Sequence, residues 1–378
     1  MRRFARAVAV GLAVGACCLP MWGQVAAPKI ADEEVARQVD KVLQGMADAD
    51  KFSGAVLVAR GGKPIFKKAY GMASREFGVP NTPETMFNIG SIEKLFTRIS
   101  ISQLLDAGKI ASVDDKLGKY LPEYPNMDAR DNVTIRQLLN MQSGIGDFFG
   151  DKFDVSSKDA FRTLKDYLPL FANEPLQFRP GADQKYSNGG YIVLGLVIEK
   201  LSGQSYYEYV KEHICVPLGL SSTGFPFADV PVKGVAEGYT HHGLQEWPEL
   251  HKNAYTLPAR GSSAGGGYST VGDLLLLANA IREEKIKNPE FEEGAPKAAD
   301  GGFQNIRGIG IAGGAPGLNG VVESGLPGGY TIVVLANLDP PTAQITADAL
   351  RPALGLPAPQ RRMMRPGPPP GAGPEPNK

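Results

Sequence analysis

Residues 85–108 read TMFNIGSIEKLFTRISISQLLDAG, and this stretch decides how the rest of the chain is arranged. After a short extended approach, the sequence predicts a turn at Gly90 and a helix that begins at Ser91 and ends at Gly108. Apolar residues recur there at helical spacing, with mostly small polar residues between them: Ile92, Leu95, Phe96, Ile99, Leu104 and Leu105. Because such a helix is apolar on nearly every side, we expect it to lie buried between other elements.

Ser91 and Lys94 place a hydroxyl and an amine on one face of the predicted helix, since residues three apart are neighbours there. A lysine in an apolar site loses the water that stabilises its ammonium form, so its pKa falls. A neutral amine beside a hydroxyl is a general base beside a nucleophile, and the N–H groups at a helix start favour an oxyanion. A serine at a helix start is more often only an N-cap, so the hypothesis of catalysis depends on the rest of the chain.

Length and composition predict one large or two closely packed domains with a sizeable core. The chain has 378 residues, 43% of them hydrophobic, and a formal net charge of zero. No basic stripe is visible, so a nucleic-acid partner is not expected. No stretch is long enough to span a bilayer as a helix, so no integral membrane span is predicted.

The N-terminus has the pattern of a cleaved signal peptide, which we place at residues 1–27. Arg2, Arg3 and Arg6 precede an apolar run over 7–19, and small residues follow around 23–27. A periplasmic or secreted protein is therefore predicted. The less favoured alternative is a lipid anchor on Cys17, because residues 14–17 loosely resemble a lipoprotein cleavage motif. Cleavage in this region leaves Cys215 as the one cysteine, so no internal disulfide is expected.

Strand patterns occur at both ends of the chain and helical patterns between them. A helix is predicted over 32–49, strands over 53–59 and 64–72, a largely helical insertion over about 109–258, and a helix over 269–285. Three further strands over 305–311, 319–323 and 330–337 precede a last helix over 342–354. The two ends are expected to pair into one antiparallel sheet, which gives an α+β fold with one domain over 28–357 and a disordered proline-rich tail over 358–378.

Tyr186-Ser187-Asn188 forms a second polar group, in a loop just before a predicted helix. A phenol in such a loop relays a proton, and an amide holds both a lysine and a substrate carbonyl. A cleft between the sheet and the insertion is the expected place for these side chains to meet Ser91 and Lys94.

With these residues in place, the chain resembles the serine β-lactamase-related hydrolases: class C β-lactamases, D-alanyl-D-alanine carboxypeptidases, and related esterases and D-aminopeptidases. The resemblance runs in family order from about residue 52 to 338. It rests on FNIGSIEKLFT, LDAGKIASVDDKLGKYLPEYP, VTIRQLLNMQSGI, YSNGGYIVLGLVIEKLSGQSYYEYV, PLGLSSTGF, SSAGGGYSTVGDLLLLANAI, GGAPG and YTIVVLAN. It implies a mixed antiparallel sheet with flanking helices and a helical insertion.

The resemblance also implies a role for each polar residue. Ser91 would be the acylated nucleophile and Lys94 its base, Tyr186 the proton relay, and Asn188 the residue that orders Lys94 and the substrate. The backbone N–H groups of Ser91 and Gly314, on an edge strand, would form the oxyanion hole.

The third motif departs from the family, because Ile311-Ala312-Gly313 stands where Lys-Thr-Gly or His-x-Gly is usual. Gly313 keeps the close backbone approach, but Ile311 and Ala312 offer no donor for a substrate carboxylate, which loses roughly 1.5–3 kcal/mol per charged hydrogen bond. The sequence therefore favours neutral ester, amide or peptide substrates. Glu93, inside the first motif, is expected to have a structural role such as one half of a salt bridge.

Several other interpretations are open at this point. A β-lactamase or a D-alanyl-D-alanine carboxypeptidase is one alternative, and a non-catalytic peptidoglycan- or ligand-binding protein on the same fold is another. Residues 261–265 match a Gly-x-Ser-x-Gly nucleophile elbow with Ser263 as its serine. In an α/β-hydrolase the catalytic histidine follows the nucleophile in the chain, but all four histidines of this chain precede Ser263, so that fold is excluded. His241 and His242 lack a third ligand at useful spacing, so neither metal nor cofactor is predicted.

Overall fold

A five-stranded antiparallel sheet joins the two ends of the chain, as predicted. The computed structural model describes residues 30–242, 246–291 and 307–358. The strand order is β2 (Lys63–Tyr70), β1 (Gly54–Arg60), β11 (Tyr330–Ala336), β10 (Leu318–Leu326) and β9 (Gly310–Ala315). The N-terminal strand β1 pairs along its whole length with the C-terminal strand β11, from Gly54 opposite Ala336 to Arg60 opposite Tyr330. The α+β fold expected from the sequence is confirmed.

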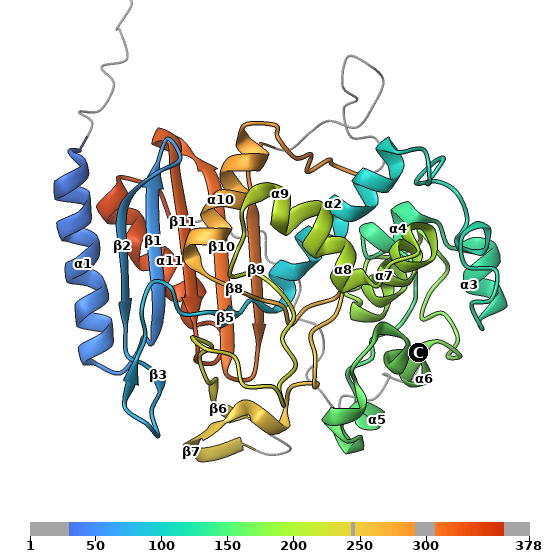
Figure 1. Cartoon of the computed structure of the whole chain (residues 1–378), viewed down its shortest axis with the longest axis horizontal. Helices are drawn as coiled ribbons and strands as arrows, with labels where there is room; N and C mark the ends of the chain where they lie inside the picture. Colours follow the sequence, from blue (N-terminus) through green and yellow to red (C-terminus); the bar gives the residue numbers. More distant parts are fainter. Residues whose placement is uncertain (1–29, 243–245, 292–306, 359–378) are drawn as a thin grey trace, which may run out of the picture.

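Each face of the sheet is covered by its own hydrophobic cluster, because side chains alternate along a strand. On β1, Val56 and Val58 pack with helices α1 (Asp32–Asp48) and α11 (Thr342–Leu350). The alternate residues of the same strand face the larger cluster, which includes helices α2 (Glu93–Asp106) and α10 (Val271–Arg282). The sheet lies on the left of Figure 1 and the helical region on the right, with α2 between them.

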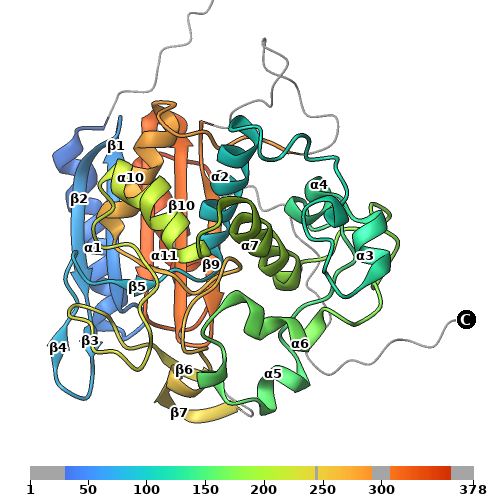
Figure 2. The same ribbon diagram turned by 45° about the vertical axis from the view of Figure 1, so that its right-hand side comes forward.

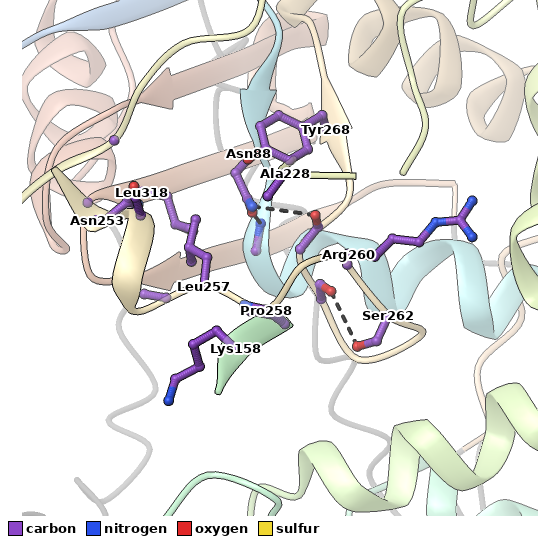
Figure 3. A pocket seen from close by; sticks show the side chains of 18 of the residues that line it. Asn88, Lys158, Ala228, Asn253, Leu257, Pro258, Arg260, Ser262, Tyr268 and Leu318 are labelled. Carbon is purple, nitrogen blue, oxygen red and sulfur yellow. Dashed lines mark hydrogen bonds between the residues drawn. The ribbon is translucent and has the colours of Figure 1, made fainter. Parts of the chain in front are cut away.

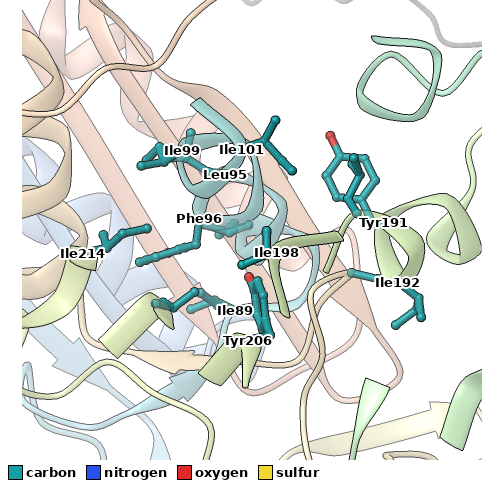
Figure 4. Packing of buried hydrophobic residues seen from close by; sticks show 14 of the residues in the cluster. Ile89, Leu95, Phe96, Ile99, Ile101, Tyr191, Ile192, Ile198, Tyr206 and Ile214 are labelled. Atoms are coloured by element: carbon teal, nitrogen blue, oxygen red, sulfur yellow. The ribbon is translucent and has the colours of Figure 1, made fainter. Parts of the chain in front are cut away.

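Helix α2 is buried at the centre of the molecule, as its apolar pattern predicts. Its first turn is a 3-10 turn, η1 (Gly90–Ile92), and the α-helix proper begins at Glu93. The helix ends before Gly108, which has a positive φ of 68° that favours glycine. Phe96 and Ile99 of α2 are fully buried and lie among side chains from α7 (Asn188–Ser202) and α8 (Tyr206–Val210) (Figure 4).

The predicted insertion is mostly helical, but its last part is not. Its remaining helices are α3 (Met127–Asn132), α4 (Ile135–Leu139), α5 (Asp151–Val155), α6 (Leu168–Phe171) and α9 (Val216–Leu218), with a π-helical turn η5 (Lys211–Cys215) between α8 and α9. Strands β6 (Tyr239–His242) and β7 (Glu246–Lys252) then form a two-stranded sheet below the main sheet (Figure 2). The prediction of helical structure up to residue 258 is therefore wrong for this segment. Tyr239 N donates to Asn337 O, so the segment packs against the end of β11 instead.

Short strand pairs link the sheet to the helices. β3 (Met72–Ser74) pairs with β4 (Val79–Pro80), and β5 (Phe87–Asn88) pairs with β8 (Tyr268–Ser269). The β5–β8 pair holds the approach to η1 against the loop that precedes α10. Thr270 caps α10 by accepting from Asp273 N.

The edge strand differs from its prediction over 305–311. The observed strand β9 is Gly310–Ala315, with the sequence GIAGGA. Its glycines have low strand propensity, but pairing with β10 holds them extended, since tertiary context outweighs propensity in sheets. The predicted signal peptide, over 1–27, and nearly all of the predicted tail, over 358–378, lie outside the described residues, and the boundaries of the domain stay a prediction. No described helix is long and apolar enough to cross a membrane.

Candidate active site

Ser91 lies in a tight turn between β5 and α2, and the turn is built by Gly90. Gly90 has a φ of 50°, and its N–H donates to Asn88 Oδ1 over 3.0 Å. A Cβ placed on Gly90 would lie 2.8 Å from the backbone nitrogen of Gly314 on β9, so only glycine allows this approach. The Ser91 hydroxyl is thereby presented at the edge of the sheet.

Lys94 lies one turn further along the same helix, and its amine has three hydrogen-bond partners. Nζ lies 3.1 Å from Ser91 Oγ and 2.7 Å from Asn188 Oδ1, and it donates to the Ala264 carbonyl. The residue is only 4% exposed. Burial lowers the pKa of Lys94 to about 7, and it outweighs the opposite effect of nearby acidic groups, of which Asp147 contributes most. A large fraction of the amine is therefore neutral at neutral pH.

Asn188 reaches Lys94 from the first turn of α7, and Asp147 holds it there. Ser187 caps α7 by accepting from Gly190 N, so Asn188 is fixed at the helix start. Asp147 Oδ2 accepts from the backbone N–H of Asn188 over 3.1 Å and from its Nδ2 over 2.9 Å. With both of these donors bound to Asp147, the amide oxygen faces Lys94. Sequence reasoning did not find Asp147; its one signal is an acidic residue within GIGDFFG, a glycine and aromatic segment.

Tyr186 brings its phenol to the nucleophile from the loop before α7. Its hydroxyl lies 2.5 Å from Ser91 Oγ, and its ring lies beside Lys94, with Nζ 4.8 Å from the ring centre. Nearly half of Tyr186 is exposed (47%), but burial around the hydroxyl raises its pKa to about 12. The phenol is thus protonated throughout the neutral range and is a proton donor.

The edge strand β9 passes directly beside the Ser91 turn. A Cβ on Gly313 would lie 2.7 Å from the Ser91 nitrogen and 2.1 Å from the Ile89 carbonyl oxygen, so this position has room only for glycine. Ala312 is exposed and lines the cleft, whereas Ile311 packs partly against the core. The strand therefore presents backbone and methyl groups to the site.

The cleft in front of Ser91 has a volume of about 1260 Å³ and lies between the helical region and strand β9 of the sheet. Ser91, Tyr186, Asn188, Gly313 and Gly314 all line it. Aromatic and aliphatic side chains make up much of the remaining wall, among them Phe148, Phe149, Phe227, Leu257, Tyr268 and Leu318. Figure 3 shows Leu257, Pro258 and Leu318 along one part of this wall.

The cations among the described lining residues are bound by other protein groups. Lys158 donates to three backbone carbonyls, and Lys252 pairs with Glu76 and Glu237. Arg260 donates to Phe225 O, and its guanidinium lies 3.6 Å from the Tyr207 ring centre and 4.5 Å from that of Phe227. In Figure 3 the guanidinium of Arg260 points away from Leu257 and Pro258. None of these three cations is placed as a free partner for a substrate carboxylate.

The glycine-rich loop over 261–266 closes the site from a third side. Ala264 O accepts from Lys94, and Asn88 Nδ2 donates to Gly266 O over 3.4 Å (Figure 3). Ser263, the serine of the elbow-like pattern, is fully buried and donates to Tyr191 O, so it is not a nucleophile. The backbone role of Ala264 carries no side-chain signal and was not predicted.

Metal ligands are not gathered anywhere in residues 30–242, 246–291 and 307–358: no group of three His, Cys, Asp or Glu side chains is placed to hold an ion. His242 lies on the surface, with Nε2 3.8 Å from Asp339.

Comparisons with known proteins point to one family. The family model described as Beta-lactamase matches residues 39–353. A penicillin-binding protein of Bacillus subtilis (strain 168) is 30% identical over 227 residues, 59% of this chain and 48% of that protein. The teichoic acid D-alanine hydrolase of Staphylococcus aureus is 31% identical over 260 residues, 68% of this chain and 59% of that protein. The chain thus spans about half to three fifths of the length of these relatives.

A solved structure supports the same fold. The penicillin binding protein from Bacillus halodurans superposes with a TM-score of 0.70 at 30% identity, covering 82% of this chain and 98% of that one.

Proposed function

The chain belongs to the β-lactamase family of serine hydrolases, and from that premise we propose that it cleaves neutral ester or amide substrates through an acyl-enzyme on Ser91. Lys94 acts as the general base, Tyr186 as a proton donor, and Asn188 as the residue that orders Lys94. The backbone N–H groups of Ser91 and Gly314 bind the developing oxyanion.

The observation that carries this proposal is the set of partners around the Lys94 amine. A neutral amine has two N–H donors and one lone pair. The Asn188 oxygen and the Ala264 carbonyl are acceptors, so they take both N–H groups. The lone pair is then left for the third neighbour, the Ser91 hydroxyl at 3.1 Å. The neutral form of Lys94 is thus oriented as a base toward Ser91.

The reaction follows from this arrangement. Lys94 takes the Ser91 proton as Oγ attacks the substrate carbonyl, and negative charge develops on the carbonyl oxygen beside Ser91 N and Gly314 N. When the tetrahedral intermediate collapses, the bond to the leaving group breaks. The leaving group takes a proton from the Lys94 ammonium, with the Tyr186 phenol beside Oγ as the relay. Water then attacks the acyl-enzyme, releases the acid and returns the proton to Ser91.

Neutral substrates with an apolar acyl group are favoured by the walls of the cleft. Ala312 contributes a methyl group where a donor would bind a substrate carboxylate, and the lining cations Lys158, Lys252 and Arg260 are bound elsewhere. Because the Staphylococcus aureus relative is named as a hydrolase of teichoic acid D-alanine, D-alanyl esters and amides belong in the substrate panel beside plain esters and β-lactams.

Export to the periplasm or the medium is the second part of the proposal. The arginines at the N-terminus and the apolar run over 7–19 support a cleaved leader. N-terminal sequencing of the protein from cell fractions tests this, and the expected result is a mature protein that begins between residues 24 and 28, after cleavage among the small residues over 23–27. A lipid-modified Cys17 would replace this proposal with membrane anchoring.

The experiment that tests catalysis is labelling with a fluorophosphonate followed by intact mass measurement. The expected result is one adduct per chain, located at Ser91, and none on Ser91→Ala. The same protein should hydrolyse p-nitrophenyl butyrate much faster than a cephalosporin. An unlabelled wild type would instead support a non-catalytic binding protein, and efficient cephalosporin hydrolysis would support a β-lactamase.

A further inference from the structure

Glu93, next to Lys94 in the sequence, is a buried carboxyl group whose hydrogen-bond partner is a phenol rather than a cation. The residue is 1% exposed, and its Oε1 lies 2.8 Å from the hydroxyl of Tyr206 on α8. Its other oxygen lies against Gly267, where a Cβ would come within 2.3 Å of Oε2. The salt bridge considered for Glu93 is therefore replaced by a contact with an uncharged group.

The Glu93 carboxyl is the first member of a row of four oxygen atoms. Glu93 Oε1 lies 2.8 Å from Tyr206 Oη, which lies 2.8 Å from Thr97 Oγ1, which lies 2.7 Å from the Ser263 carbonyl oxygen. All three distances are those of O–H···O hydrogen bonds, and each such bond contains one proton. The row therefore needs three protons, and its two hydroxyl groups supply only two.

The position of the third proton follows from the Ser263 end. A backbone carbonyl only accepts, so Thr97 donates its single proton to Ser263 O. Tyr206 must then donate to Thr97, and the remaining bond, between Glu93 and Tyr206, needs a proton carried by Glu93. With an ionised Glu93, one pair of buried oxygens 2.8 Å apart would have no proton between them, and two facing oxygens without a proton are costly in a buried site.

The titratable groups around Glu93 agree with a neutral carboxyl. Lys94 is the neighbour on the same helix, Tyr206 and Tyr207 face it from α8, and Cys215 faces it from η5. Burial raises the pKa of Glu93 well above its usual value, more strongly than Tyr206 and Lys94 lower it. Burial likewise raises the pKa of Cys215 to about 12 and that of Tyr206 well above its usual value, so these two neighbours are uncharged at neutral pH.

We propose that Glu93 is a positioning residue that is held as a neutral carboxylic acid and supports Lys94 as the base. Its row of hydrogen bonds ends on Ser263 O, and the next carbonyl, Ala264 O, accepts from Lys94. The row therefore fixes the loop that orients the amine. A neutral Glu93 also places no negative charge beside Lys94, where an anion would stabilise the ammonium form. This role rests on the proposed function of Lys94.

The kinetic test compares Glu93→Gln with Glu93→Ala. Glutamine is uncharged, and its NH₂ group donates to Tyr206 as the acid does. In Glu93→Gln, kcat/KM for p-nitrophenyl butyrate should therefore stay within about twofold of wild type. The midpoint of its pH profile should stay within about 0.3 pH units of the wild-type midpoint. Alanine removes the first donor of the row and should lower kcat/KM about tenfold or more. Glu199→Gln is the matched control for the change from glutamate to glutamine. The Glu199 carboxyl also contacts Tyr206, because it accepts from the backbone N–H of Tyr206. A midpoint that moves down by about a unit or more in Glu93→Gln would reveal an anion at this position and overturn the proposal.

An infrared measurement tests the proton on Glu93 without using activity. The difference spectrum between wild type and Glu93→Gln at neutral pH should contain the C=O band of a protonated carboxylic acid. Carboxylate bands in its place would refute the neutral acid. Because this result does not depend on turnover, it separates a failure of the inference about Glu93 from a failure of the proposed hydrolysis.

Discussion

The two sides of the cleft are equipped very differently. The helical side, from α2 and α7, has a fully connected polar network around Ser91, in which Asp147 holds Asn188 and Asn188 holds Lys94. The strand side, from β9, presents backbone groups and the methyl groups of Ala312 and Ala315. In the proposed mechanism, the groups that form and break bonds are thus separate from the groups that would recognise a substrate's charge. A chain of this family can thus keep the polar side chains around Ser91 complete while strand β9 offers no donor side chain to the substrate.

The largest expected effects come from the helical side. Lys94→Met keeps most of the stem but removes the base, and it should lower kcat/KM about 10²- to 10⁴-fold, while Ser91→Ala should fall to the uncatalysed rate. Lys200→Met, an exposed lysine on α7 that pairs with Glu123, is the control for loss of an amine. Ester hydrolysis and the rate of fluorophosphonate labelling are the measurements. Near-normal labelling of Lys94→Met would remove Lys94 from the mechanism.

On the strand side, the largest effect should come from Gly313→Ala. The added Cβ would meet Ile89 O at 2.1 Å and Ser91 N at 2.7 Å, so β9 must move away from the oxyanion hole. The loss of one oxyanion donor costs about 10²- to 10³-fold in kcat. Gly310→Ala is a matched control in the same strand, because a Cβ there meets nothing within 4 Å. Thermal melts of both variants separate a local displacement from unfolding. Equal activity of the two variants would show that the close approach of β9 is not needed.

The pH dependence should reflect Lys94 rather than Tyr186. The pKa of Lys94 is lowered to about 7 by burial, and the base works only in its neutral form. Below pH 7, kcat/KM should therefore fall about tenfold per unit, and above pH 7 it should reach a plateau. The pKa of Tyr186, raised to about 12, keeps the phenol protonated across this range. Rates are measured after subtraction of the Ser91→Ala background. A profile that still rises steeply at pH 9 would contradict a neutral Lys94 at pH 7.

The difference between the two sides also explains how much could be predicted from the sequence. Ser91 and Lys94 share one helix whose apolar period is strong, so their proximity follows from local geometry. The pairing of β1 with β11 follows from apolar strand patterns at both ends of the chain. Strand β9 was placed several residues too early, because GIAGGA has little strand propensity and is held extended by β10.

Contacts made only in the folded chain had no local signal. Asp147 bonds to Asn188 across 41 residues, and Glu93 meets Tyr206 across 113. Nothing next to either acid in the sequence indicates its partner. Asp147 lies in the loop after α4 and meets Asn188 because α4 packs against α7, and Glu93 meets Tyr206 because α2 packs against α8. The proton count at Glu93 needs three distances in a row, and no pattern of residue types supplies them.

The smallest expected effect adds a donor to the strand side. Ala312 is exposed in the cleft, so Ala312→Thr places a hydroxyl where a substrate carboxylate could accept from it. The ratio of kcat/KM for p-nitrophenyl hemisuccinate to that for p-nitrophenyl butyrate should rise about tenfold, which corresponds to roughly 1.4 kcal/mol. Ala312→Val has the same shape without the hydroxyl and should leave the ratio near that of wild type. If threonine and valine change the ratio equally, shape rather than the missing donor sets the preference for neutral substrates, and the contrast between the two sides of the cleft would need another cause.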